Sequence, residues 1–202
     1  MAADGQAPGG QAVARMVAAI RACRLCEPEI EARPVIRASA SAKICIVGQA
    51  PGIRVHNTGI PFNDPSGERL RAWMGVDSET FYDEARVAIV PMAFCFPGYN
   101  EHGSDKPPRR ECAVQWREKL FTVLPPFGLT LVVGSYAQAW HLKGRLGANM
   151  TETVKAWRTF APKMIPLPHP SWRNNAWLKK NPWFEDELLP YLRSRVQRVL
   201  RG

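Results

Sequence analysis

The sequence lacks any long apolar run, and its N-terminus lacks the pattern of a secretory signal. No stretch of the 202 residues approaches the roughly 20 apolar residues needed to span a bilayer. The N-terminus has no basic segment followed by an apolar one, which is the layout of a secretory signal. There is no internal repeat, and the one biased tract is the Gly/Ala/Gln-rich beginning of the chain. These absences predict a cytoplasmic protein without membrane association.

Acidic residues are comparatively scarce. There are 18 Asp and Glu against 27 Lys and Arg, which gives a net charge of +9. An excess of this size suits a polyanionic partner, and nucleic acid is the first candidate. A generally basic soluble protein without such a partner is the alternative at this point.

The composition is that of a globular protein, with 46% hydrophobic and 22% charged residues. We expect a disordered tail over residues 1–12 and a single domain over residues 13–202, and we expect a monomer. Short apolar runs rich in β-branched residues predict strands, and helical patterns separate them. Strands that alternate with helices predict an α/β fold, a parallel sheet with helices on both faces. The predicted strands are 43–47, 87–91, 129–133 and 164–167.

The pentapeptide GQAPG occurs twice, at Gly5–Gly9 and at Gly48–Gly52. The first copy lies in the expected tail. The second directly follows a predicted strand, and open α/β folds place their ligands at the carboxyl ends of strands. The second copy is therefore the candidate for a site, although a Gly/Pro-rich loop alone is a weak signal.

Two other loops carry reactive or aromatic side chains. GIPFNDPSG places Phe62 beside Asp64, which is typical either of a hydrophobic plug with a helix N-cap or of an aromatic platform with a working carboxylate. PHPSWR places His169 at the end of a predicted strand, followed by Trp172 and Arg173. A single His is usually structural, but basic and aromatic residues behind it suit contact with nucleotides.

Five cysteines in a cytosolic chain argue against a disulfide framework. Cys45 lies inside a predicted strand and is most simply a core residue. The others are a C-x-x-C at Cys23 and Cys26, Cys95 after the second predicted strand, and Cys112 at the start of a predicted helix.

Five segments in order resemble the uracil-DNA glycosylase superfamily, and most closely its iron–sulfur branches, families 4 and 5. They are GQAPG at 48–52, GIPFNDPSG at 59–67, CFPGYN at 95–100, KPPRRECA at 106–113 and HPS at 169–171. The resemblance implies a three-layer α/β/α fold with a four-stranded parallel sheet. It implies excision of uracil from single- or double-stranded DNA by hydrolysis of the N-glycosidic bond, after the base is flipped out, leaving abasic DNA.

The resemblance also implies residue roles. Asp64 and His169 are the expected catalytic residues, His169 as the donor to uracil O2. Expected to bind the substrate are Gly48, Gln49, Ala50, Phe62 and Asn100. From their place in or just after the site loops, we expect contacts with DNA from Arg54, Ser171, Trp172 and Arg173, with a core position as the equal alternative for Trp172. Cys23, Cys26, Cys95 and Cys112 are the expected ligands of one [4Fe–4S] cluster, with zinc as the rival because four Cys also suit tetrahedral Zn²⁺.

The chain departs from family 4 at two positions. Gln49 stands where family 4 has Glu, and Gln cannot act as a general base. Pro91 stands at the position of the Asn that reads the edge of uracil, so we expect uracil to be read through backbone groups near Gln49 and Ala93. Because of these departures two other classes remain: a protein that binds uracil-DNA or abasic DNA with little turnover, and an iron–sulfur sensor or structural protein on the same fold.

Overall fold

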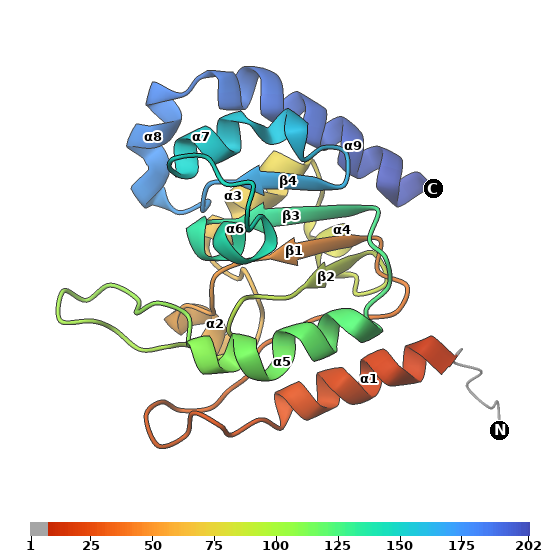
Figure 1. Cartoon of the computed structure of the whole chain (residues 1–202), viewed down its shortest axis with the longest axis vertical. Coiled ribbons are helices and arrows are strands. Elements are labelled where there is room, and N and C mark those ends of the chain that lie inside the picture. The colour runs from red at the N-terminus through yellow and green to blue at the C-terminus, as the bar shows by residue number, and fades with distance from the viewer. Residues whose placement is uncertain (1–7) are drawn as a thin grey trace.

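The computed structural model describes residues 8–202, and its centre is a sheet of four parallel strands in the order β2-β1-β3-β4 (Figure 1). Ile46 of the inner strand β1 pairs with Ile89 of β2 on one side and with Leu131 of β3 on the other. The predicted four-stranded parallel sheet is therefore confirmed. The strands are β1 (Ile44–Val47), β2 (Val87–Ile89), β3 (Leu129–Val133) and β4 (Met164–Leu167).

Nine α-helices connect and flank the strands within these residues. They are α1 (Pro8–Arg21), α2 (Ile53–Thr58), α3 (Pro65–Met74), α4 (Ser78–Tyr82), α5 (Arg110–Val123), α6 (Ser135–His141), α7 (Met150–Lys155), α8 (Asn175–Lys180) and α9 (Leu189–Arg201). A π-turn at 184–188 precedes α9, and 3-10 turns occupy 157–159 and 172–174. No helix of residues 8–202 has the length and apolar character that crossing a membrane requires.

The expected boundary of the N-terminal tail needs a correction. Helix α1 begins at Pro8, so residues 8–12 of the expected tail are helical. Proline suits the start of a helix, because the backbone N–H that it lacks would have no partner there. Residues 1–7, with most of the first GQAPG copy, lie outside the described residues.

The alternation of side chains along the strands divides the core into two layers. Ile44 and Ile46 of β1 face α3, α4, α7 and α9, whereas Cys45 and Val47 face α1, α5 and α6. In Figure 1, α1 and α5 lie side by side below the sheet and α9 lies above it. Cys45 is fully buried in β1, as expected of a core residue.

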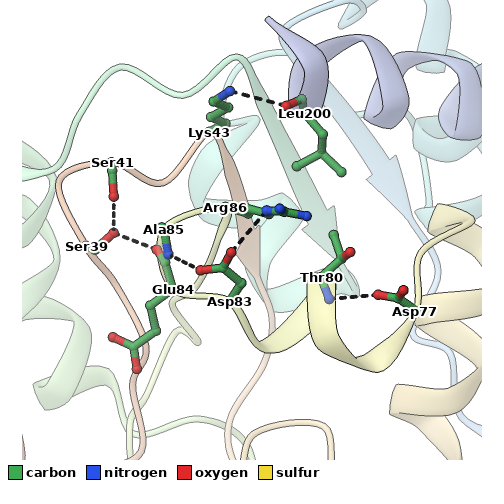
Figure 2. A network of polar contacts seen from close by, with 10 residues as sticks. All are labelled: Ser39, Ser41, Lys43, Asp77, Thr80, Asp83, Glu84, Ala85, Arg86 and Leu200. Atoms are coloured by element: carbon green, nitrogen blue, oxygen red, sulfur yellow. Dashed lines mark hydrogen bonds and ion pairs between the residues drawn. The ribbon is translucent and has the colours of Figure 1, made fainter.

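Polar contacts tie together the segments that enter the amino ends of β1 and β2 (Figure 2). Lys43 Nζ donates to the Leu200 carbonyl at 3.2 Å, and Ser39 Oγ donates to the Glu84 carbonyl at 2.6 Å. Arg86 pairs with Asp83 at 3.0 Å. These contacts fix the edge of the sheet at which the strands begin. The candidate loops emerge at the other edge, where the strands have their carboxyl ends.

Candidate active site

A cleft of about 360 Å³ opens at the carboxyl ends of the strands. Its walls come chiefly from the GQAPG loop after β1, the loop before α3, the segment after β4, and two residues of the long segment after β2, Pro91 and Asp105. This is the edge at which α/β folds bind ligands, and the volume suits a small planar molecule. Of the predicted site residues, those that line the cleft are Gly48, Gln49, Ala50, Phe62, Asp64, His169, Ser171 and Arg173.

The GQAPG loop is held by backbone hydrogen bonds to the segment that follows β2. The Gly48 carbonyl accepts from Met92 N–H at 2.9 Å, and the Gln49 carbonyl accepts from Ala93 N–H at 3.2 Å. The Ala93 N–H is thus already engaged in a hydrogen bond within the protein, so the expectation that it helps to read the base is not supported. Among residues 8–202, the backbone N–H groups of Gln49 and Ala50 donate to no protein acceptor, so they are the donors that this loop can offer to a ligand.

Phe62 is held in an unusual backbone conformation with φ of +54°. Its ring lies under the start of the GQAPG loop, since a Cβ added to Gly48 would be 3.5 Å from the tip of the ring. Its carbonyl accepts from Tyr82 Oη at 3.2 Å, and its ring meets Phe81 edge-on at 6.1 Å. The aromatic face is therefore preorganised in the cleft wall.

Asp64 has the N-cap role that its sequence context allows, and its side chain also borders the cleft. It is the N-cap of α3, and its Oδ1 accepts from Gly67 N–H at 2.9 Å. The same side chain lines the cleft. The cap therefore fixes the orientation of the carboxylate, and a carboxylate in this cleft stabilises positive charge that develops on a bound molecule.

His169 follows β4 and packs over Gly134, where an added Cβ would be 3.7 Å from the His169 Cβ. Its carbonyl accepts from Asn174 Nδ2 at 2.6 Å. Burial, and to a smaller degree the Arg173 charge, lowers the pKa of His169, while Asp64 opposes this shift. The imidazole is therefore neutral at pH 7 and can donate one N–H to a ligand oxygen.

The segment after His169 forms the rim of the cleft. Arg69 of α3 donates to the Ser171 carbonyl at 3.0 Å, which fixes this segment to the opposite wall. The Trp172 side chain is 73% exposed and does not line the cleft, and the Arg173 guanidinium lies 5.7 Å from its ring centre. Arg54 lies on α2, exposed and also outside the cleft lining.

The structure does not bring Asn100 to the cleft. Its Oδ1 accepts from the N–H groups of His102 and Ser104, at 3.0 and 2.9 Å. Asn100 and Ser104 also share a backbone hydrogen bond of 2.8 Å. The expected substrate contact is thereby corrected to a structural role, because the side chain that would read a base is used to close a hairpin.

Among the cleft residues that sequence reasoning did not single out, Asp105 is the one carboxylate. It lies at the base of this hairpin, in the loop that projects at the left of Figure 1, and forms an antiparallel bridge with Tyr99. Asp105 is exposed, and partial desolvation together with the nearby Asp64 raises its pKa, while Arg173 opposes the shift. The sequence signal is weak, since Glu101 and Asp105 are two acids in one polar loop and the sequence does not distinguish them.

The four cysteines other than Cys45 line a second, mostly apolar cavity between the segment after α1 and the start of α5. They come from the C-x-x-C at Cys23 and Cys26, from Cys95 and from Cys112. No three His, Cys, Asp or Glu side chains of residues 8–202 are placed to hold a metal ion. The predicted ligands therefore converge on one cavity without forming a site for a metal ion.

The surroundings of this cavity suit an anionic sulfur cluster. Trp116 Nε1–H donates to Cys23 Sγ at 3.3 Å, and Phe94 N–H donates to Cys112 Sγ at 3.4 Å. Arg109 lines the cavity, and its Nε is buried without a protein partner. Burial raises the pKa of the Cys112 thiol to about 12, so a metal bound here would have to displace the thiol proton.

Residues 36–193 match the sequence model of the uracil DNA glycosylase superfamily. This chain belongs to that superfamily. Membership implies a DNA glycosylase, a hydrolase that cleaves the N-glycosidic bond of a base in DNA. All residues that line the cleft except Val35 lie within the match, whereas Cys23 and Cys26 of the second cavity precede it. The match therefore shows the family, and it assigns no role to single residues of either cavity.

The conformation of Phe62 depends on Gly67. An added Cβ at Gly67 would lie 1.8 Å from the Phe62 carbonyl oxygen. We expect Gly67→Ala to lower the free energy of unfolding by about 1–3 kcal/mol, because the loop or α3 must shift. Urea unfolding measures this. Gly9→Ala is the control: nothing lies within 4 Å of its added Cβ, and stability should hold or rise slightly. Equal stability of the Gly67 variant and the parent would show that the loop accommodates the added Cβ without a cost in free energy.

Proposed function

We propose that this glycosylase excises uracil from DNA. The observation that carries the proposal is the convergence of an aromatic face, a carboxylate and a neutral imidazole on one cleft: Phe62, Asp64 and His169. Enzymes that act on a base must take it out of the helix and enclose it. A planar ring stacks on Phe62, and base stacking on an aromatic side chain contributes about 1–3 kcal/mol.

Recognition of uracil then relies on backbone and imidazole donors. The N–H groups of Gln49 and Ala50 suit a carbonyl oxygen of the base, and the Gln49 side chain both donates and accepts. Pro91, which also lines the cleft, has no side-chain donor or acceptor. The donor set therefore favours a base with carbonyl oxygens at its edge.

The chemistry divides between the two sides of the bond that breaks. As the N-glycosidic bond lengthens, negative charge collects on uracil O2, and His169 donates to it; such stabilisation is often worth roughly 3–4 kcal/mol. Positive charge collects on the sugar, and the Asp64 carboxylate stabilises it. The low pKa of His169 keeps its ring neutral, so it acts as a hydrogen-bond donor without transferring a proton.

An oligonucleotide with a single uracil tests the proposal. We expect the parent protein to give an alkali-labile product, Asp64→Asn to lower the single-turnover rate with nearly unchanged binding, and Phe62→Ala to weaken binding as well. Retention of the DNA without product would identify a binding protein. If the protein neither retained the DNA nor formed product, both functions would be contradicted. Excision at the parental single-turnover rate by Asp64→Asn would remove Asp64 from the mechanism.

The rim supplies cations for the DNA backbone. Arg54, Arg173, Lys179 and Lys180 are exposed near the mouth of the cleft or just after its last segment. Trp172 is exposed beside Arg173 and would fill the gap that a flipped base leaves. Phosphate contacts release counterions, so affinity must fall as salt rises.

We expect the logarithm of the DNA binding constant to fall linearly with the logarithm of salt concentration. Arg173→Gln should reduce the slope by about 1 if it contacts one phosphate. Lys163→Gln is the matched control, because exposed Lys163 precedes β4 at the opposite end of the sheet. Fluorescence anisotropy over a salt series measures both. Equal slopes for the parent and Arg173→Gln would exclude Arg173 from the interface.

We further propose that the cysteine cavity holds a [4Fe–4S] cluster with Cys23, Cys26, Cys95 and Cys112 as ligands. The N–H···S contacts and the buried Arg109 Nε support an anionic centre. Zinc is the rival occupant, because four Cys also suit tetrahedral Zn²⁺. The cluster would serve as a structural link between the end of α1 and the start of α5.

Anaerobically purified protein should be brown and should contain about four irons per chain by elemental analysis. Cys112→Ala should lose most of this iron. Cys45→Ala is the control, because Cys45 is buried in β1 outside the cavity and should leave the iron content unchanged. One zinc per chain without iron would contradict the cluster and leave the glycosylase proposal intact.

A further inference from the structure

We propose that Asp105 is the general base that takes a proton from the attacking water. This inference rests on the proposed excision of uracil and assigns the one role that the expected residues leave open. Hydrolysis needs a water nucleophile, and Gln49 has no basic group with which to activate it. Within the cleft lining only two side chains are carboxylates, Asp64 and Asp105.

The two carboxylates differ in how the protein uses them. Asp64 has one oxygen engaged as the cap of α3. The Asp105 carboxylate accepts no hydrogen bond from the side chains or backbone of residues 8–202, and its Oδ2 lies 3.5 Å from the position of a Cβ added to Gly52. Asp105 therefore faces the end of the GQAPG loop with both oxygens available for a water molecule.

The hairpin holds Asp105 at this position. Lys106 N–H donates to the Gly98 carbonyl at 2.9 Å, and the Tyr99–Asp105 bridge closes the base of the hairpin. Across the cleft mouth, Arg173 donates to Ser104 Oγ at 3.4 Å. The hairpin is thus in contact with the segment that carries His169, so Asp105 and the base-binding residues belong to one preorganised site.

The proposed step balances as a hydrolysis. The bond between uracil N1 and C1′ of the deoxyribose breaks, and its electron pair leaves with uracil, whose O2 is stabilised by His169. The water oxygen forms a bond to C1′ while Asp105 accepts the water proton. That proton, passed on through solvent, neutralises the uracil anion, and the products are uracil and an abasic site with a 1′-hydroxyl. Asp64 stabilises the sugar cation during the exchange.

Single-turnover excision by Asp105→Asn tests the proposal. We expect the rate to fall at least about 100-fold, the range of a general base, with DNA binding retained. Glu101→Gln is the matched control, since Glu101 is an exposed carboxylate of the same hairpin outside the cleft lining, and it should excise at the parental rate. Asp105→Ala should regain activity in sodium formate and not in sodium chloride of equal concentration.

The pH profile distinguishes a base from a structural carboxylate. Partial desolvation and Asp64 raise the pKa of Asp105, and Arg173 opposes this shift. Because a general base must be deprotonated, the parental rate should fall as the pH drops through a value above the ordinary pKa of Asp. His169 titrates beside the same two groups, so the limb assigned to Asp105 is the part that disappears in Asp105→Asn.

Each outcome decides a different point. Parental rates for Asp105→Asn would overturn the role of Asp105 and leave uracil excision standing. A slow variant that formate does not rescue and that keeps the parental pH profile would also overturn it, because a structural residue behaves in this way. Absence of uracil excision by the parent protein would overturn the proposed function itself, and this inference with it.

Discussion

The parallel pairing of β1 with β2 on one side and β3 on the other is the constraint on which the rest of the structure depends. Parallel strands end at the same edge of a sheet, so loops that are far apart in the sequence emerge together. Because β1 is buried on both faces, its register is fixed, and the position of the GQAPG loop is fixed with it. The cleft follows from this: its walls are the segments that leave this edge.

A buried arginine links the cleft to the cysteine cavity. Arg117 of α5 is 2% exposed and donates to the carbonyls of Val90 and Pro91, just after β2. It also donates to His141 Nε2 at 2.6 Å, and burial and the guanidinium lower the pKa of His141 to about 3, which keeps that ring a neutral acceptor. A buried charge is tolerated where it is fully hydrogen-bonded. The interaction joins α5, which begins beside Cys112, to Pro91 in the cleft wall.

Much of this arrangement was predictable from the sequence, for physical reasons. The strands at 129–133 and 164–167 were predicted with their observed bounds, because short buried runs bounded by Gly and Pro have sharp ends. Helices α2, α4 and α8 were not predicted, since five or six residues are too few for a helical period. The loops carrying Phe62, Asp64 and His169 could be recognised because strand ends and motifs mark them. Asn100 and Asp105 could not be told apart in this way, since their roles depend on how a hairpin folds back.

The hairpin of residues 99–105 also changes the electrostatics of the site. The protein is strongly basic overall, which attracts DNA but would make a carboxylate in the cleft a weak base if cations surrounded it. Only Arg173 lowers the pKa of Asp105 to a significant degree, whereas partial desolvation and Asp64 raise it.

Arg173 itself is directed toward the rim by its contacts with Trp172 and Ser104. The exposed cations lie at the mouth, whereas Asp64 is half-buried in the cleft wall and Asp105 borders the cleft from the exposed hairpin, so different side chains serve binding of the polyanion and the chemistry at the sugar. When DNA covers the mouth, solvent is excluded from Asp105, and the desolvation that already raises its pKa increases. Closure of the cleft by its own substrate would therefore make Asp105 a stronger base at the moment when the reaction requires one.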